Sequence, residues 1–215
     1  MKKATFLGVS EASIAVIFDV LEEEYAVKNF DIHLNIATDV VPSLPFKTIE
    51  YTIRPLFEKI HSDEKVFFGV ASPNNKRSVF NDFLVTQEID KDRYRTLIHS
   101  KSSIASSAVI EKGVLIESHV VVSSQSLIEF GVFIKRGSVV GHHNRIGAFT
   151  DINPGVTLSG KVTVGASCII GSGAVVKDNI TIGANTIIGV GSVVTKDIPA
   201  NSVAYGNPCK VVRSN

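Results

Sequence analysis

The stretch that decides the fold runs from residue 134 to residue 152 and reads IKRGSVVGHHNRIGAFTDI. An aliphatic residue stands at every sixth position of this stretch. The spacing continues in both directions and gives sixteen aliphatic residues in an unbroken series, fifteen of them β-branched. The series consists of Ile104, Ile110, Ile116, Val122, Ile128, Ile134, Val140, Ile146, Ile152, Leu158, Val164, Ile170, Val176, Ile182, Ile188 and Val194. A period of six fits neither an amphipathic helix nor a single alternating strand.

A six-residue period is the hexapeptide signature of a parallel β-helix. Each hexad predicts one short strand and one turn, and three successive hexads form one triangular coil. Coils stack at the inter-strand spacing of about 4.8 Å, with the aliphatic residue of each hexad pointing into the prism. No hexad is interrupted, so no long loop is expected to leave the prism. The period itself does not set the handedness of the coil, because the usual crossover rule favours the right hand.

The first hundred residues contain no hexads and predict strands that alternate with helices. This order favours a small parallel sheet covered by helices, with ligands bound at the carboxyl ends of its strands. Those ends are residues 8–10, 37–39 and 69–75. The sequence thus predicts a Rossmann-like α/β domain at residues 1–98 and a β-helix domain with a C-terminal tail at residues 99–215. The expected elements are strands at 3–10, 30–36 and 66–71 and helices at 11–24, 52–61 and 75–87.

Composition excludes several classes of function. The 22 Lys and Arg residues balance 21 Asp and Glu residues, so a nucleic-acid partner is not expected. No apolar run approaches the roughly 18 residues of a membrane span, so membrane insertion is not expected. Ser10 and Glu11 interrupt the first apolar stretch, which argues against a signal peptide. Cys168 and Cys209 lack metal-type spacing and predict two free thiols in a cytoplasmic protein.

Three stretches carry a family resemblance. They are residues 99–105 (HSKSSIA), 140–147 (VGHHNRIG) and 203–213 (VAYGNPCKVVR). With the order of the two domains, they resemble the O- and N-acetyltransferases of sialic acids and nucleotide-linked amino sugars. The resemblance covers nearly the whole chain. It implies a left-handed β-helix, acetyl-CoA as co-substrate with no metal, a sugar acceptor and a homotrimer.

The resemblance also implies catalytic residues. His142 matches the family's general base, a role that suits a neutral imidazole. His143 stands where the family usually has a carboxylate, and Asp151 stands where it usually has a second histidine. Gly160 follows His142 by 18 positions, so it lies above it in the next coil. The resemblance places the acetyl carbonyl near the Gly160 N–H, which would stabilise the oxyanion.

Coenzyme contacts are expected on another edge of the prism. Backbone groups at Ser172 and Val190 match the family's pantetheine-binding positions, and Lys210 and Arg213 could pair with the coenzyme phosphates. Two prism faces can meet at one site only when two subunits pack together. A trimer would therefore build three sites at its interfaces.

Acceptor contacts are expected in the first domain. Gly8 and Ser10 match the first two fixed positions of a family turn that reads Gly-x-Ser-Gly-His-Gly. Glu11 replaces the next glycine and would repel a diphosphate. Asn75 and Arg77, after the third expected strand, are further candidates for contact with the acceptor, although helix capping and a surface charge explain them equally well.

Simpler interpretations and two other functions stay open. His142, His143, Asp151 and Lys210 are also residue types found at solvated turns and tails. A metal-dependent hydratase of the carbonic anhydrase type would need three histidine ligands. The prism offers His119, His142 and His143, and the adjacent pair should not point at one metal. A catalytically inactive scaffold or CoA-binding module would explain the altered turn at Gly8 and the missing carboxylate after His142.

Overall fold

A computed structural model describes residues 3–36, 50–56 and 58–215. The chain forms two compact units. The α/β unit consists of Met1–Ala71 and Asn75–Leu97, and the prism unit consists of Ser72–Asn74 and Ile98–Asn215. The break after Leu97 lies one residue before the boundary expected after residue 98.

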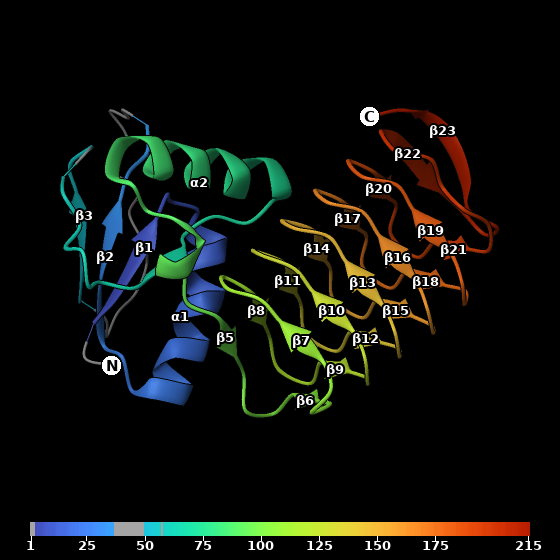
Figure 1. Cartoon of the computed structure of the whole chain (residues 1–215), viewed down its shortest axis with the longest axis horizontal. Helices are drawn as coiled ribbons and strands as arrows, with labels where there is room; N and C mark the ends of the chain where they lie inside the picture. The colour runs from blue at the N-terminus through green and yellow to red at the C-terminus, as the bar shows by residue number, and fades with distance from the viewer. Residues whose placement is uncertain (1–2, 37–49, 57) are drawn as a thin grey trace. The chain divides into compact units, whose positions relative to one another are not determined.

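The α/β unit contains a four-stranded parallel sheet in the order β3-β2-β1-β4 (Figure 1). Apolar residues on its strands and on α1 form the core, in which Phe30 packs against Phe6 and Phe18 at ring-centroid distances of 5.2 and 4.9 Å. The elements are β1 (Ala4–Leu7), α1 (Glu11–Tyr25), β2 (Asn29–His33), β3 (Glu50–Arg54), β4 (Val66–Phe68), α2 (Pro73–Gln87) and a 3₁₀ turn, η1 (Lys91–Arg93).

The expected alternation of strands and helices is confirmed except at residues 52–61. The helix predicted there is wrong, because Glu50–Arg54 is strand β3. Tyr51 and Ile53 pair in parallel register with Phe30 and Ile32 of β2. This alternation with polar residues is the pattern of an edge strand. The strand end expected at residues 37–39 lies outside the described residues.

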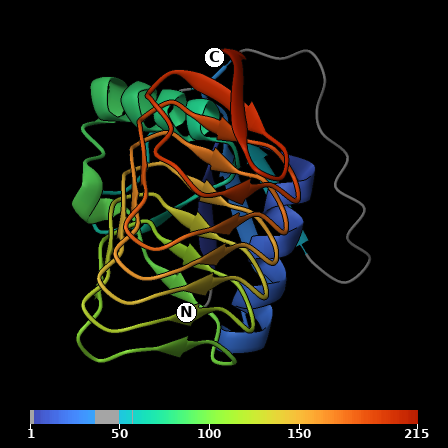
Figure 2. The same cartoon turned by 90° about the vertical axis from the view of Figure 1, so that its right-hand side faces the viewer.

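The prism unit confirms every hexad. Sixteen two-residue strands, β6 to β21, occupy the sixteen expected positions and stack into three parallel sheets (Figures 1 and 2). Each strand pairs with the strand three hexads away, as β11 does with β14. The fold is a left-handed parallel β-helix. Its strands are β6 (Ser103–Ile104), β7 (Val109–Ile110), β8 (Leu115–Ile116), β9 (Val121–Val122), β10 (Leu127–Ile128), β11 (Phe133–Ile134), β12 (Val139–Val140), β13 (Arg145–Ile146), β14 (Asp151–Ile152), β15 (Thr157–Leu158), β16 (Thr163–Val164), β17 (Ile169–Ile170), β18 (Val175–Val176), β19 (Thr181–Ile182), β20 (Ile187–Ile188) and β21 (Val193–Val194).

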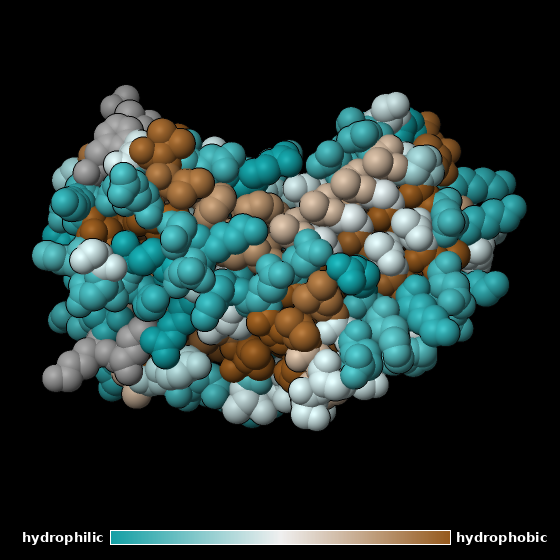
Figure 3. Space-filling model, in the orientation of Figure 1, coloured by the Kyte–Doolittle hydropathy of each residue, from teal (hydrophilic) through white to brown (hydrophobic). Residues whose placement is uncertain are grey.

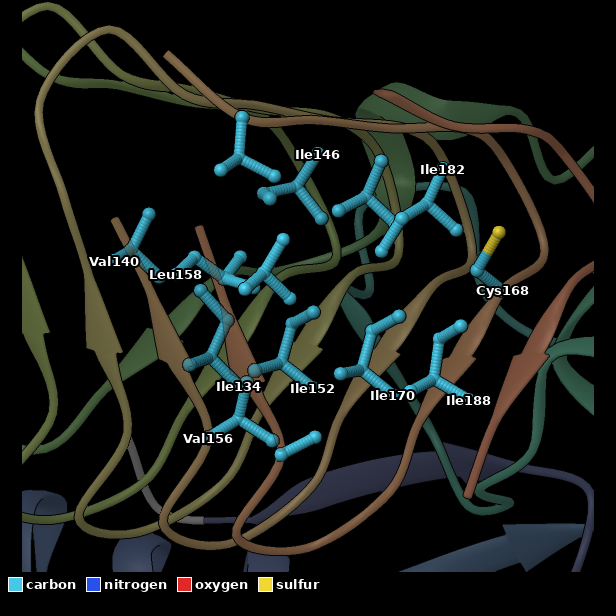
Figure 4. Close-up of a cluster of buried hydrophobic side chains, with 14 of the residues drawn as sticks. Ile134, Val140, Ile146, Ile152, Val156, Leu158, Cys168, Ile170, Ile182 and Ile188 are labelled. Carbon is cyan, nitrogen blue, oxygen red and sulfur yellow. The ribbon is translucent and has the colours of Figure 1, made fainter. Parts of the chain in front are cut away.

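The second residue of each strand points into the prism and the first points outward. Ile134, Ile152, Ile170 and Ile188 form one inward ladder, and none is more than 1% exposed (Figure 4). Burying each of these side chains contributes about 1.5–3 kcal/mol. The ladder fixes the register of the coils, so residues one full coil apart stack on one another at the corners as well.

Short strands close the two ends of the prism's eight-stranded sheet. Strand β5 (Leu97–Ile98) lies at one end. At the other end β22 (Ser202–Tyr205) pairs with β20, and β23 (Lys210–Ser214) pairs antiparallel with β22. Such end pieces cover sheet edges that would otherwise offer unpaired backbone groups. No helix in the described part of the chain has the length and apolar character needed to cross a membrane.

Candidate functional site

The turn between β12 and β13 carries the two adjacent histidines. His142 and His143 are both exposed on this turn. The backbone of His143 has a φ of 58°, and its N–H donates to the carbonyl oxygen of Ser124 in the preceding coil. This left-handed conformation turns the chain at the corner and lets the His143 ring reach back toward its neighbour. The two rings meet edge to face, with centroids 5.2 Å apart.

The two imidazoles share one hydrogen bond. The Nδ1 atoms of His142 and His143 are 3.0 Å apart, so one donates and the other accepts. When His142 Nδ1 carries the hydrogen, its Nε2 presents a free lone pair, as a general base requires. His143 can then hold the hydrogen on its own Nε2. The pair therefore allows the tautomer of His142 that a general base requires, without a carboxylate.

Gly160 lies against the His142 ring. A Cβ atom at Gly160 would sit 2.5 Å from His142 Nε2 and 2.6 Å from Cε1. Any other residue at position 160 would push the ring away. The Lys161 N–H also donates to the His142 carbonyl oxygen at 2.8 Å, which ties the two coils together at this corner. Gly160 thus stacks against His142 one coil on, with the Nε2 atom over the backbone of Gly160, and the roles of the two residues as base and oxyanion donor stay predictions.

Asp178 is a residue of this corner that the sequence analysis did not single out. It follows Gly160 by 18 positions, and its Oδ1 accepts the Gly160 N–H at 2.7 Å. The N–H expected to bind an acetyl carbonyl therefore already has a partner within the chain. Continuing from His142 past Gly160 by one more coil would have found it.

Asp151 lies on a different face. It is the outward residue of β14 in the eight-stranded sheet, whereas His142 lies at the corner between the other two sheets. This face is opposite that corner, so within one chain the two side chains do not meet. The Asp151 carboxylate is buried and accepts the Ser72 N–H at 3.2 Å. A catalytic role for Asp151 stays a prediction and would need a second copy of the chain.

The residues expected to bind coenzyme lie along another corner of the prism. Ser172 and Val190 stack there, with the Gly191 N–H donating to the Ser172 carbonyl oxygen at 2.9 Å. Val190 is 77% exposed and Ser172 is exposed. This corner and the His142 corner are the two edges of the six-stranded sheet. Lys210 is exposed on β23.

Comparisons with known proteins agree with this architecture. Residues 161–196 match the family model for the bacterial transferase hexapeptide. A His→Asn variant of perosamine N-acetyltransferase from Caulobacter crescentus, solved with CoA and GDP-perosamine, is 22% identical, with a TM-score of 0.78 over 100% of this chain and 98% of that one. The fold is that of the hexapeptide acetyltransferases. A comparison with curated protein sequences finds no match.

Two further solved structures share this hexapeptide acetyltransferase fold. The acetyltransferase domain of PglB from Neisseria gonorrhoeae FA1090 is 22% identical, with a TM-score of 0.80 over 98% of this chain and 99% of that domain. WeeI from Acinetobacter baumannii AYE is 18% identical, with a TM-score of 0.80 over 99% of this chain and 100% of that protein. The likeness includes both units, so the pairing of an α/β domain with the prism belongs to the fold.

The first turn of the α/β unit differs from a phosphate-binding loop. The Gly8 N–H donates to the His33 carbonyl oxygen and the Ser10 N–H donates to that of Gly69, both at 2.8 Å. These two amides are therefore not free for a ligand. Gly8 has a φ of 74°, and a Cβ there would meet Val79 Cγ2 at 2.7 Å, which explains the glycine by packing. Ser10 is extended and its side chain makes no capping bond to α1.

The other two residues that the sequence predicts to contact the sugar acceptor lie in the first turns of α2. Asn75 and Arg77 are both exposed. They follow β4, which neighbours β1, so they share with Gly8 and Ser10 the carboxyl edge of the sheet. The structure thus groups the four acceptor candidates at one edge, the edge at which α/β sheets bind ligands.

Metal ligands do not gather in the described parts of the chain. Among those residues no group of three His, Cys, Asp or Glu side chains could hold a metal ion. His119 lies in another coil, and His143 already bonds His142 through Nδ1. The arrangement fits proton transfer by an imidazole better than metal binding.

Proposed function

We propose that this protein transfers an acetyl group from acetyl-CoA to an amino or hydroxyl group of a nucleotide-linked sugar, with His142 as the general base. The observation that carries the proposal is the position of His142 Nε2 against Gly160, with Nδ1 bonded to His143 at 3.0 Å. Likeness over the whole chain to perosamine N-acetyltransferase, solved with CoA and GDP-perosamine, supports the substrate class, and likeness to the acetyltransferase domain of PglB supports acetyl transfer.

In the proposed reaction the acceptor nitrogen or oxygen attacks the thioester carbonyl carbon while His142 Nε2 takes its proton. Negative charge develops on the carbonyl oxygen, which the Gly160 N–H stabilises. The carbon–sulfur bond then breaks, and the departing thiolate takes the proton back from His142. The products are the acetylated sugar and CoA. His143 acts as a positioning residue, because its Nδ1 accepts from the His142 imidazolium throughout.

The proposed enzyme works as a trimer in the cytoplasm. Val121, Val139, Thr157 and Val175 follow one another in an outward column on the six-stranded sheet, and the three valines are 39%, 38% and 41% exposed. In the view of Figure 3, apolar residues lie among polar ones on the surface of the prism. Such a column is suited to contact with a second copy of the chain. The sheet that carries it borders both the His142 corner and the Ser172 corner, so packing there would build a coenzyme groove between subunits.

The acceptor is proposed to bind the α/β unit through Asn75 and Arg77. The paired amides of Gly8 and Ser10 leave that turn less able to hold a diphosphate, so binding would depend more on side chains. The inactive scaffold remains the second candidate, favoured by the occupied N–H of Gly160.

Calorimetric titration of acetyl-CoA, followed by a thiol-release assay with a panel of nucleotide-linked amino sugars, tests the proposal. We expect coenzyme binding, and release of CoA with at least one acceptor. Coenzyme binding without turnover on any amine or hydroxyl would favour the scaffold. Failure to bind acetyl-CoA at all would contradict both candidates that use the coenzyme.

A further inference from the structure

The Gly160 N–H has two acceptors to consider, the Asp178 carboxylate and the thioester carbonyl oxygen of the acyl donor. In the free protein it bonds Asp178 Oδ1 at 2.7 Å, whereas the proposed reaction needs it for the thioester oxygen. A backbone N–H has a single hydrogen and makes one strong, well-aligned bond. The Gly160 N–H therefore cannot bond both acceptors at the same time.

The chemistry of the two acceptors also disfavours their presence together at the Gly160 N–H. The acceptor on Asp178 is a carboxylate oxygen, and the thioester oxygen gains negative charge as the reaction proceeds. A carboxylate left within bonding distance of the same N–H would repel the oxyanion rather than stabilise it. Asp178 must leave this position before acyl transfer begins.

Asp178 is free to leave. Its side chain is exposed, and in the described parts of the chain Gly160 is its hydrogen-bond partner, with no lysine or arginine paired to it. Rotation into water replaces the lost bond with hydration. Gly160 itself is buried, so its N–H has no comparable alternative and keeps Asp178 until another acceptor arrives.

We propose that Asp178 determines how strongly the site distinguishes acetyl-CoA from free CoA. Acetyl-CoA must displace the carboxylate from the Gly160 N–H, whereas free CoA has no carbonyl at this point and leaves the contact intact. Asp178 thereby weakens binding of the acyl donor selectively. The inference rests on the proposed function and adds a residue that sets its specificity.

The test measures the dissociation constants of acetyl-CoA and of CoA by calorimetry for the wild type and for Asp178→Ala. The ratio Kd(CoA)/Kd(acetyl-CoA) should rise by about two- to tenfold in the variant, the worth of one net hydrogen bond. Asp178→Asn keeps a neutral acceptor of the same shape and should raise the ratio less. The Asp178→Asn variant also provides the test if the Asp178→Ala substitution lowers the stability of the protein.

Asp197→Ala is the matched control. Asp197 is likewise exposed and its Oδ1 accepts a prism backbone N–H, that of Thr181 at 2.8 Å, which the proposed reaction does not use. This variant should leave the ratio unchanged. An unchanged ratio in both Asp178 variants, with CoA still bound, would overturn the inference and leave the proposed function standing. Wild-type protein that binds neither coenzyme would instead overturn the proposed function and this inference with it.

Discussion

His142 and His143 are joined by one hydrogen bond between their Nδ1 atoms, which are 3.0 Å apart. A histidine thus stands at position 143, where the resemblance of the sequence to sugar acetyltransferases implies a carboxylate. A neutral imidazole is a weaker hydrogen-bond acceptor than a carboxylate. We therefore expect the pair to support catalysis, with His143 stabilising the His142 imidazolium less than a carboxylate would.

The His143→Asn substitution tests this pairing. Asparagine tolerates the φ of 58° at this position, so the turn should keep its shape. We expect kcat to fall by up to about tenfold, the worth of one hydrogen bond, with little change in the KM for acetyl-CoA. His119→Asn is the control, since His119 is exposed and also has a φ of 58° but lies in another coil. Equal kcat values in the two variants would contradict the role of His143.

Gly160→Ala should separate activity from stability. The new Cβ would collide with the His142 ring, a side chain that can move, so we expect about 100-fold lower activity in a folded protein. At Gly165 the Cβ would instead meet the backbone nitrogen of Ala184 at 2.4 Å. Gly165→Ala should therefore destabilise the prism by about 1–3 kcal/mol. Thermal unfolding and thiol release measured on both variants check the contrast; loss of stability at Gly160 alone would contradict it.

His33 should make the α/β unit sensitive to acid. Burial lowers the pKa of His33, and the nearby carboxylates of Asp31 and Glu64 offset this only in part. As pH falls below about 6.5 the unfolded chain binds a proton that the folded chain does not, so stability falls, by at most about 1.4 kcal/mol per pH unit. His33→Gln should flatten the dependence of the melting temperature on pH between about 7 and 5. The control is His61→Gln at an exposed position, and this substitution should not flatten the dependence of the melting temperature on pH.

Cys168 should resist thiol reagents in the native protein. Burial in the prism raises its pKa to about 11, and its thiol donates to the Gly183 carbonyl oxygen at 3.1 Å. At pH 8 only about one molecule in a thousand carries the reactive thiolate. Burial also raises the pKa of Cys209. A thiol titration should therefore find both cysteines slow to react in the native state and fast in denaturant. Rapid reaction of either thiol in the folded protein would contradict this.

The repeat was predictable because the interior of a narrow prism accepts aliphatic residues at one position of each hexad. The same step of one full coil predicted the stacking of Gly160 on His142. Strand β3 was missed because it is stabilised by pairing with β2, a contact distant in sequence from Thr52.

The site was predictable only in part. Asp151 follows His142 by half a coil, so it lies on the opposite side of the prism and not beside His142. The step of one coil reaches Asp178 from Gly160, but the bond of Asp178 to the Gly160 N–H depends on the rotamer of an exposed carboxylate, which no sequence period encodes. The bond between the two histidines depends on the positive φ of His143, a conformation that residue identity alone does not indicate.

The most direct test of the account is the rate of CoA release by wild type and by His142→Asn, with the acceptor found in the panel and saturating acetyl-CoA. Because asparagine cannot take the proton, we predict a rate about 100- to 10,000-fold lower, with acetyl-CoA affinity nearly unchanged. A His142→Asn variant that releases CoA at the wild-type rate would contradict the assignment of His142 as the base.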